Sequence, residues 1–320
     1  MLSKEFAVKQ KIILREVGLR DGLQIHPTFM PTDRKLAWIA AEAAAGIGEI
    51  EVTSYVPPKL IPQFADAAEV TTESLRIPNL MVAALIPNLR GAQRGIELGV
   101  QKLNFVMSVS HTHNLKNVRR EPDESVADFK SIVALIKAQP EGKRPIITGG
   151  LSTALGCSYE GRVAVSAVVK RAVQLVQAGA DELVVADTVG YADPIQVREV
   201  FQAVLKEVGD TPVAAHFHDT RGTGLANVSA ALDCGITRFD ASLAGLGGCP
   251  FAPGASGNIV MEDLCFMLDS MGYNTGVDLG QLVQVREIIS QALPDVSLQG
   301  AIARAGLPHN YQTAAQRRAA

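Results

Sequence analysis

Short apolar runs alternate along the chain with longer stretches in which apolar residues recur every three to four positions. The short runs are typical of buried strands and the longer stretches of amphipathic helices. The expected strands are Lys11–Glu16, Glu49–Thr53, Leu80–Leu85, Lys102–Met107, Pro145–Ser152, Glu182–Asp187, Pro212–His216 and Phe239–Ser242. The expected helices include Arg34–Ala45, Gly91–Leu98, Ser125–Leu135, Val163–Gly179, Ile195–Val208 and Leu225–Cys234.

Eight such strand–helix units predict an α/β fold, a (β/α)8 TIM barrel. An open, doubly wound sheet also alternates strands and helices, but no Gly-x-Gly-x-x-Gly follows the first strand. Leu279–Leu293 is expected to form an extra C-terminal helix. We therefore expect a catalytic barrel domain over residues 1–293, and a C-terminal tail over residues 294–320 that is solvated and disordered.

Composition narrows the classes of protein. The chain has 320 residues, 47% of them hydrophobic, and a net charge of -3, so no basic surface for nucleic acid is expected. No apolar run is long enough to span a bilayer, and the first residues lack the apolar core of a secretory signal.

The four cysteines are too scattered for a disulfide framework or for the Cys-x-x-Cys pairs of a structural zinc site. A cytoplasmic location is expected. Cys157, Cys234 and Cys265 are interpreted as small buried hydrophobes.

Polar residues gather where the expected strands end, which is where TIM barrels carry their active sites. Arg20 and Asp21 follow the first strand, Glu51 lies in the second and Asp187 ends the sixth. His216 and His218 end the seventh, and residues two apart on a strand point to the same face.

Each of these residues also has a purely structural interpretation. Arg20 and Glu51 can form a structural ion pair, Asp21 can cap a turn, and a lone histidine at a strand end is often a hydrogen-bonded core residue. Stability alone does not explain why charged groups from four strands should meet at one rim. We therefore expect these residues to form a functional site.

Asp21, His216 and His218 form a set of two imidazoles and one carboxylate, to which Asn258 can add an amide oxygen. Closed zinc sites favour thiolates, whereas this mixed set leaves positions open for a chelating substrate and suits Mn²⁺ or Mg²⁺. The same ligand types also describe a non-haem iron site.

The segment from Gly245 to Gly257 is too rich in glycine and proline for a helix or a central strand. A long irregular loop of this kind is often an active-site lid. Its Cys249 is a candidate acid or nucleophile, although a merely tolerated thiol is the simpler interpretation.

Four motifs resemble the hydroxymethylglutaryl-CoA lyases, a branch of the metal-dependent TIM-barrel lyases. They are Gly18-Leu-Arg-Asp-Gly-Leu-Gln24, Ile50-Glu-Val-Thr-Ser-Tyr-Val56, His216-Phe-His-Asp-Thr220 and Ala244-Gly-Leu-Gly-Gly-Cys-Pro-Phe-Ala-Pro-Gly-Ala-Ser-Gly-Asn258. The resemblance runs from about Lys11 to Leu293. It implies cleavage of 3-hydroxy-3-methylglutaryl-CoA to acetyl-CoA and acetoacetate, a place in leucine degradation, and a homo-oligomer such as a dimer or tetramer.

The resemblance also implies residue roles. Asp21, His216, His218 and Asn258 are expected to bind the divalent cation, and His216 to take part in proton transfer. Arg20 is expected to polarise the thioester carbonyl, with Glu51 and Asp187 as supporting residues and Cys249 as the loop thiol.

Two segments depart from the family pattern. Ser108–Arg120 is unusually rich in histidine and arginine, and Gly149–Ser152 replaces a sequence that contains a tyrosine. His111 and His113 have no acidic residue beside them in the sequence, so we interpret them as pocket or surface residues.

The leading hypothesis is a divalent-metal-dependent carbon–carbon lyase acting on an acyl-CoA. Alternatives that keep the chemistry are citramalyl-CoA or a longer 3-hydroxyglutaryl thioester as substrate. Two other classes are a non-haem iron oxygenase and an inactive barrel that serves as a binding protein.

Overall fold

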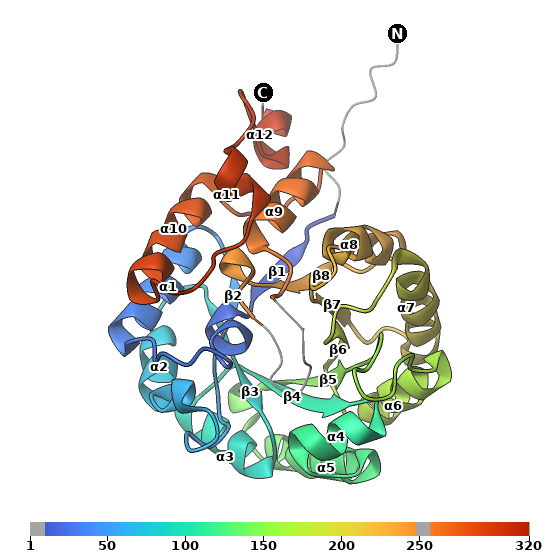
Figure 1. The fold of residues 1–320 in the computed structure, drawn as a ribbon. Coiled ribbons are helices and arrows are strands. Elements are labelled where there is room, and N and C mark those ends of the chain that lie inside the picture. Colours follow the sequence, from blue (N-terminus) through green and yellow to red (C-terminus); the bar gives the residue numbers. More distant parts are fainter. Residues whose placement is uncertain (1–9, 248–256, 320) are drawn as a thin grey trace.

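Eight parallel strands close into a barrel in the order β1 to β8, and helices surround it (Figure 1). The computed structural model describes residues 10–247 and 257–319. The strands are β1 Ile13–Glu16, β2 Glu49–Ser54, β3 Met81–Ile86, β4 Lys102–Ser108, β5 Ile146–Ser152, β6 Glu182–Asp187, β7 Val213–Phe217 and β8 Arg238–Ala241. This confirms the predicted TIM barrel.

The helices occupy the outer layer and the loops between strands. They are α1 Thr32–Ala44, α2 Ala67–Ser74, α3 Leu89–Leu98, α4 His111–Val118, α5 Pro122–Lys137, α6 Val165–Ala178, α7 Pro194–Val208, α8 Gly224–Asp233, α9 Met261–Ser270, α10 Leu279–Ala292, α11 Ala301–Ala305 and α12 Ala314–Ala319. Leu103, Phe105 and Met107 of β4 are buried between the strands and this layer. Alternate residues of the same strand face the barrel interior.

Two differences from the expected elements bear on the site. Helix α4 was not among the expected helices, because most of its side chains are polar. It is capped by Ser110, whose hydroxyl accepts a hydrogen bond from the main-chain N–H of His113 at 3.1 Å. Strand β7 ends at Phe217, and His218 forms an isolated antiparallel bridge to Asn258.

An ion-pair network fills the barrel interior on the side where the strands begin. Arg15 of β1 contacts Glu182 of β6, and its guanidinium lies 2.5 Å from Asp240 of β8. Lys102 of β4 lies 2.7 Å from Glu49 and 3.0 Å from Glu182. Burial alone would lower the pKa of Arg15, but Asp240 and Glu182 raise it above its ordinary value. Complementary pairing is what allows these charges to be buried.

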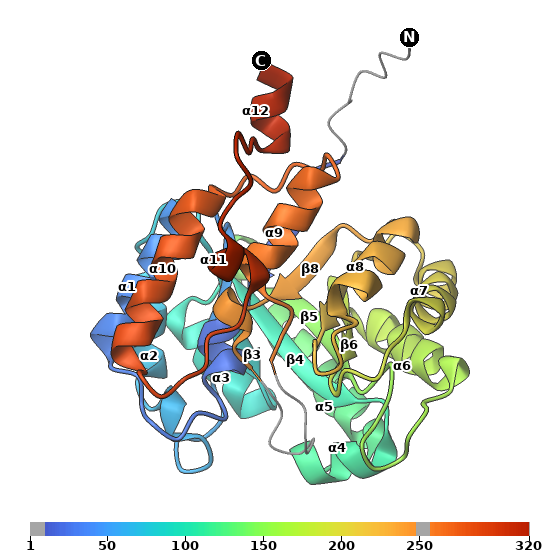
Figure 2. The same cartoon turned by 45° about the horizontal axis from the view of Figure 1, so that its top comes forward.

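The C-terminal segment differs from the disorder expected there. Helix α11 begins where the Asp263 carboxylate accepts hydrogen bonds from the main-chain N–H groups of Ala301 and Ile302, at 2.7 and 2.8 Å. The Tyr311 hydroxyl lies 3.1 Å from Asp269, and Arg317 contacts the carbonyl of Asp269. Helix α12 stands beyond α9 at one edge of the barrel (Figure 2). The proposed division of the chain at residue 293 stays a prediction.

Among the described residues, no helix combines the length and apolarity that crossing a bilayer requires.

Candidate metal centre and active site

The segment that carries Arg20 and Asp21 is a tight π-helical turn, Gly18–Gly22, directly after β1. The Glu16 carboxylate fixes this turn to the one that follows β8. One of its oxygens accepts a hydrogen bond from the N–H of Gly18 at 2.5 Å, and the other accepts one from the N–H of Leu243 at 2.9 Å. Glu16 therefore holds the turn after β1 and the turn after β8 together beneath the site.

Strand β7 and the residue after it supply both histidines. The His216 ring lies 5.1 Å from the His218 ring between centroids. Asp240 of β8 lies 3.1 Å from Nδ1 of His216, which leaves Nε2 as the candidate ligand atom of that side chain. A carboxylate behind an imidazole fixes its tautomer and orientation, and such pairs are common behind metal-bound histidines.

Asn258 reaches the site through its bridge to His218. Its Nδ2 donates to Oδ2 of Asp21 at 2.8 Å and to the carbonyl of Leu246 at 2.9 Å. Gly247 allows this approach, because a Cβ at that position would lie 2.2 Å from Nδ2 of Asn258, and its φ of 144° also disfavours a side chain. The main-chain N–H of Gly257 bonds the carbonyl of Gly247 at 2.9 Å.

Asp21, His216 and His218 can each offer one ligand atom, and these atoms all lie within 4.8 Å of one another. All three residues are buried, with 5%, 7% and 2% of their surface exposed. Within the described part of the chain, Oδ1 of Asn258 and Nδ1 of His218 are buried without a hydrogen-bond partner. A buried carboxylate, two imidazoles and an unsatisfied amide oxygen fit a divalent cation.

The electrostatics of Asp21 also suit a ligand. Burial alone would raise the pKa of this carboxyl, but Arg20 and then His218 hold it well below its ordinary value. Asp21 is therefore ionised throughout the neutral range, as metal binding requires. Nε2 of His218 lies 3.3 Å from its Oδ2.

Arg20 lies between two acids at the mouth of the barrel. Its Nε contacts Glu51 of β2, and its guanidinium donates to Oδ1 of Asp21 at 2.6 Å. The amide of Asn104 in β4 donates to the other oxygen of Glu51 at 2.8 Å. Burial alone would lower the pKa of Arg20, but Glu51 and Asp21 raise it. The guanidinium is thus held as a fixed cation beside the candidate metal ligands.

The two remaining predicted site residues are Asp187 and Cys249. Both oxygens of Asp187 accept main-chain hydrogen bonds, from Tyr191 at 2.9 Å and Ala192 at 3.0 Å, so its observed contacts hold the turn after β6. Burial raises the pKa of Asp187. Cys249 lies outside the described residues.

A cavity of about 870 Å³ opens from this cluster across the carboxyl ends of the strands. His113 of α4 is buried at its edge, with Nδ1 2.7 Å from the Ser108 hydroxyl, and burial lowers its pKa to about 4. His111 is exposed and has an acidic partner after all, since its Nε2 lies 2.7 Å from Glu121. Lys116, Arg119 and Arg120 also line the cavity and place cationic groups at its mouth.

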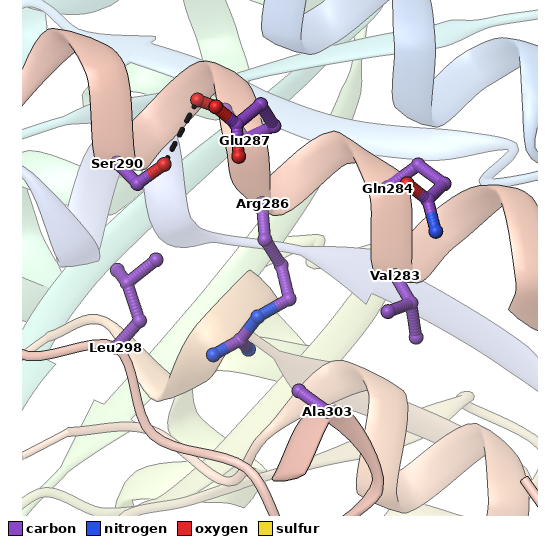
Figure 3. Close-up of a pocket in the computed structure, with 7 residues that line it drawn as sticks. All are labelled: Val283, Gln284, Arg286, Glu287, Ser290, Leu298 and Ala303. Atoms are coloured by element: carbon purple, nitrogen blue, oxygen red, sulfur yellow. Dashed lines mark hydrogen bonds between the residues drawn. The ribbon is translucent and has the colours of Figure 1, made fainter. Parts of the chain in front are cut away.

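A second, shallower pocket of about 280 Å³ lies between α10, Leu298 and Ala303 of α11 (Figure 3). Arg286 points from this helix and is already paired, 2.5 Å from Glu262 and 2.7 Å from the carbonyl of Gln299. The pocket is separate from the candidate metal ligands.

Three residues that position the site were not predicted from the sequence: Glu16, Asn104 and Asp240. Each lies in an expected strand, and an acid or amide within an apolar run is a signal that applies to all three. The same signal had singled out Glu51.

Comparisons with known proteins agree with this geometry. The model of the HMGL-like family matches residues 11–289. The chain belongs to the HMGL-like family. Hydroxymethylglutaryl-CoA lyase YngG of Bacillus subtilis is 40% identical over 296 residues, which cover 91% of this chain and 97% of that protein. The mitochondrial hydroxymethylglutaryl-CoA lyase of Gallus gallus is 37% identical over 287 residues, 90% of this chain and 95% of that protein.

Among solved structures, an HMG-CoA lyase from Acinetobacter baumannii in complex with coenzyme A and 3-methylmalate superposes with a TM-score of 0.88. It is 39% identical, and the match covers 98% of this chain and 99% of that one. This HMGL-like protein is therefore a lyase.

Proposed function

We propose that this HMGL-like protein cleaves 3-hydroxy-3-methylglutaryl-CoA to acetyl-CoA and acetoacetate with the help of a divalent cation. The observation that carries the proposal is the contact between Arg20 and Asp21, which places a fixed guanidinium beside the three clustered ligand side chains. Relatives named for this activity support it, as does the coenzyme A bound in a similar structure.

Asp21, His216, His218 and Asn258 would hold the cation, with Mg²⁺ and Mn²⁺ as the proposed ions. When bound, such a cation lowers the pKa of a coordinated hydroxyl and orients a chelating substrate. Asp240 keeps His216 in the required tautomer from behind. Two imidazoles and one carboxylate leave coordination positions for the substrate.

The cleavage breaks the C2–C3 bond. It requires loss of a proton from the C3 hydroxyl and gain of a proton at C2. The C3 hydroxyl loses its proton to a base, for which His216 is proposed, and its C–O bond becomes the ketone of acetoacetate. Since Nδ1 of His216 is paired with Asp240, His216 would take the proton on Nε2, and Asp21, His218 and Asn258 would then hold the cation. The C2–C3 bond breaks with its electron pair on C2, which forms the enolate of acetyl-CoA. That enolate then takes a proton, for which the sequence suggests Cys249 as donor.

Arg20 acts on the charge that develops at the thioester oxygen. A fixed guanidinium in a site with little water stabilises such charge more in the transition state than in the bound substrate. Glu51 and Asp21 hold the guanidinium from two sides, so it does not need to reorganise during the step. Asp187 is proposed to support the site through the turn that it closes.

The test is an assay of acetyl-CoA release by the purified protein with Mg²⁺ or Mn²⁺, over a panel of 3-hydroxyacyl-CoA thioesters. Release from the hydroxymethylglutaryl thioester, abolished by a chelator and restored by the cation, is expected. No release of acetyl-CoA from that thioester would contradict the proposal.

The comparisons do not favour citramalyl-CoA or a non-haem iron reaction. A cytoplasmic location, the homo-oligomer and the role in leucine degradation stay predictions.

A further inference from the structure

One half of the barrel interior is hollow. In β4 the interior-facing Asn104 and Val106 are partly exposed, while their outward-facing neighbours are buried. Gly150 of β5 and Val184 of β6 are likewise partly exposed. Interior positions of a TIM barrel are normally packed by bulky side chains. Here these positions border the cavity of about 870 Å³ instead.

The strand register makes these positions one continuous surface. Gly150 pairs with Val106 on one side and with Val184 on the other, so the three lie at one level across three strands. One step nearer the mouth, Ala186 pairs with His216. We call Val106, Gly150, Val184 and Ala186 the apolar wall. It therefore begins beside a candidate metal ligand.

No side chain of the apolar wall carries a hydrogen-bonding group. A larger residue at Gly150 is also disfavoured, since an added Cβ would lie 2.8 Å from the Phe105 carbonyl oxygen. Below the wall, Asn104 and Thr148 each carry a buried oxygen without a hydrogen-bond partner among the described residues. A polar floor thus limits how deep an apolar group can reach.

From this geometry we infer that the apolar wall is a subsite for the C3 branch of the substrate, and that it takes alkyl branches longer than methyl. The inference rests on the proposed function and deepens it. The substrate class is the 3-hydroxy-3-alkylglutaryl-CoA thioesters, with hydroxymethylglutaryl-CoA as its smallest branched member. The bonds that break and form are the same, and the second product is the 3-oxo acid that carries the branch.

The physical reason is burial of apolar surface. A methyl group leaves most of the apolar wall in contact with water, whereas an ethyl or propyl branch covers it. Each methylene that leaves water for an apolar surface should raise kcat/KM by about fourfold, provided that it also fits in the transition state. The cavity, at about 870 Å³, lies within the usual range of small-molecule binding pockets, about 300–1,000 Å³.

The test measures kcat/KM for thioesters with methyl, ethyl, propyl and butyl branches at C3. We expect the wild type to cleave the ethyl and propyl compounds at least as efficiently as the methyl compound. Val184→Phe should lower kcat/KM for the propyl compound by about tenfold or more relative to kcat/KM for the methyl compound. Val106→Leu, a milder change on the neighbouring strand, should act in the same direction if the first variant folds poorly.

Val184→Thr is the matched control, because it keeps the volume and adds a hydroxyl. It should weaken the preference for long branches without blocking them. A wild type that cleaves the methyl compound and rejects every longer branch overturns the inference and leaves the proposed function standing. Equal losses for methyl and propyl in Val184→Phe also overturn it, because the wall would then hold a part common to all the thioesters. If no compound is cleaved, both fail.

Discussion

An ion-pair network that includes Arg15, Lys102 and Glu182 crosses the base of the barrel, and nearer the mouth the two halves of the interior differ in chemistry. On the side of β1, β7 and β8, charged side chains meet one another, as in the contacts of Arg20 with Asp21 and of His216 with Asp240. On the side of β4 to β6, the apolar wall faces empty space. Buried charges need fixed partners, whereas a surface of small apolar residues only needs an apolar group to cover it. Under the proposed function, the reaction takes place in the charged half, and the hollow half selects the acyl group.

The largest effect should come from removing a ligand in the charged half. His218→Ala removes one of the clustered ligand atoms, and we expect loss of measurable metal binding and a fall in turnover of more than about a thousandfold. Calorimetric titration with Mn²⁺ and the acetyl-CoA assay check this. Full activity with tight metal binding would show that His218 is a structural core histidine.

The second prediction compares the contribution to stability of the charged network at the base of the barrel with that of the apolar wall. Arg15→Met leaves Glu182 and Asp240 buried without their main cation, and should lower the free energy of unfolding by about 3–5 kcal/mol. Val184→Ala in the apolar wall removes less contact and should cost about 1 kcal/mol. Urea unfolding of both variants measures the difference. Similar losses would contradict the distinction between a tightly paired charged network and a loosely packed apolar wall.

A smaller effect is expected for a residue that acts through a ligand. Asp240→Asn keeps the shape but removes the charge behind His216, and should weaken metal binding by about tenfold to a hundredfold. Thr148→Ala on the floor of the hollow half should leave metal affinity unchanged. Both affinities are read from the same calorimetric titration. An unchanged affinity in Asp240→Asn would rule out its orienting role.

A further effect concerns the dependence of stability on pH. Burial, and then the adjoining Glu16, raise the pKa of Glu42 well above its ordinary value near 4.5, and burial raises that of Glu16 as well. A raised carboxyl pKa keeps a proton on the folded state that the unfolded state has released, so stability falls as pH rises above about 5. Glu42→Gln should flatten this fall by up to about 1.4 kcal/mol per pH unit. Unfolding curves at several pH values between about 5 and 8 check it; parallel slopes would contradict it.

The sequence predicted the parts whose signal is local. Glu182–Asp187 was predicted to the residue, because an apolar run of that length stands between two helical patterns. Asp21, His216 and His218 were brought together by the rule that strand ends share one rim. Helix α4 was missed because its polar side chains give no periodic apolar signal.

What remained hidden depends on distant pairings. Asp240 interacts with Arg15, which is 225 positions away in the sequence. No local pattern around either residue therefore predicts the contact. Val106, Gly150 and Val184 look like ordinary core residues until the strand register places them side by side around a void. Packing between strands is a property of the closed barrel, and no single segment carries it.

The central claim is that the Arg20 guanidinium stabilises the charge that develops in the reaction, beside a metal ion that other residues bind. Arg20→Met tests this claim most directly. Arg20 touches Asp21 and Glu51 but is not among the clustered ligands, so its loss should separate chemistry from metal binding. We expect turnover of hydroxymethylglutaryl-CoA to fall by about a hundredfold to a thousandfold, with the affinity for Mn²⁺ within about threefold of the wild type. Near-normal turnover would contradict the account.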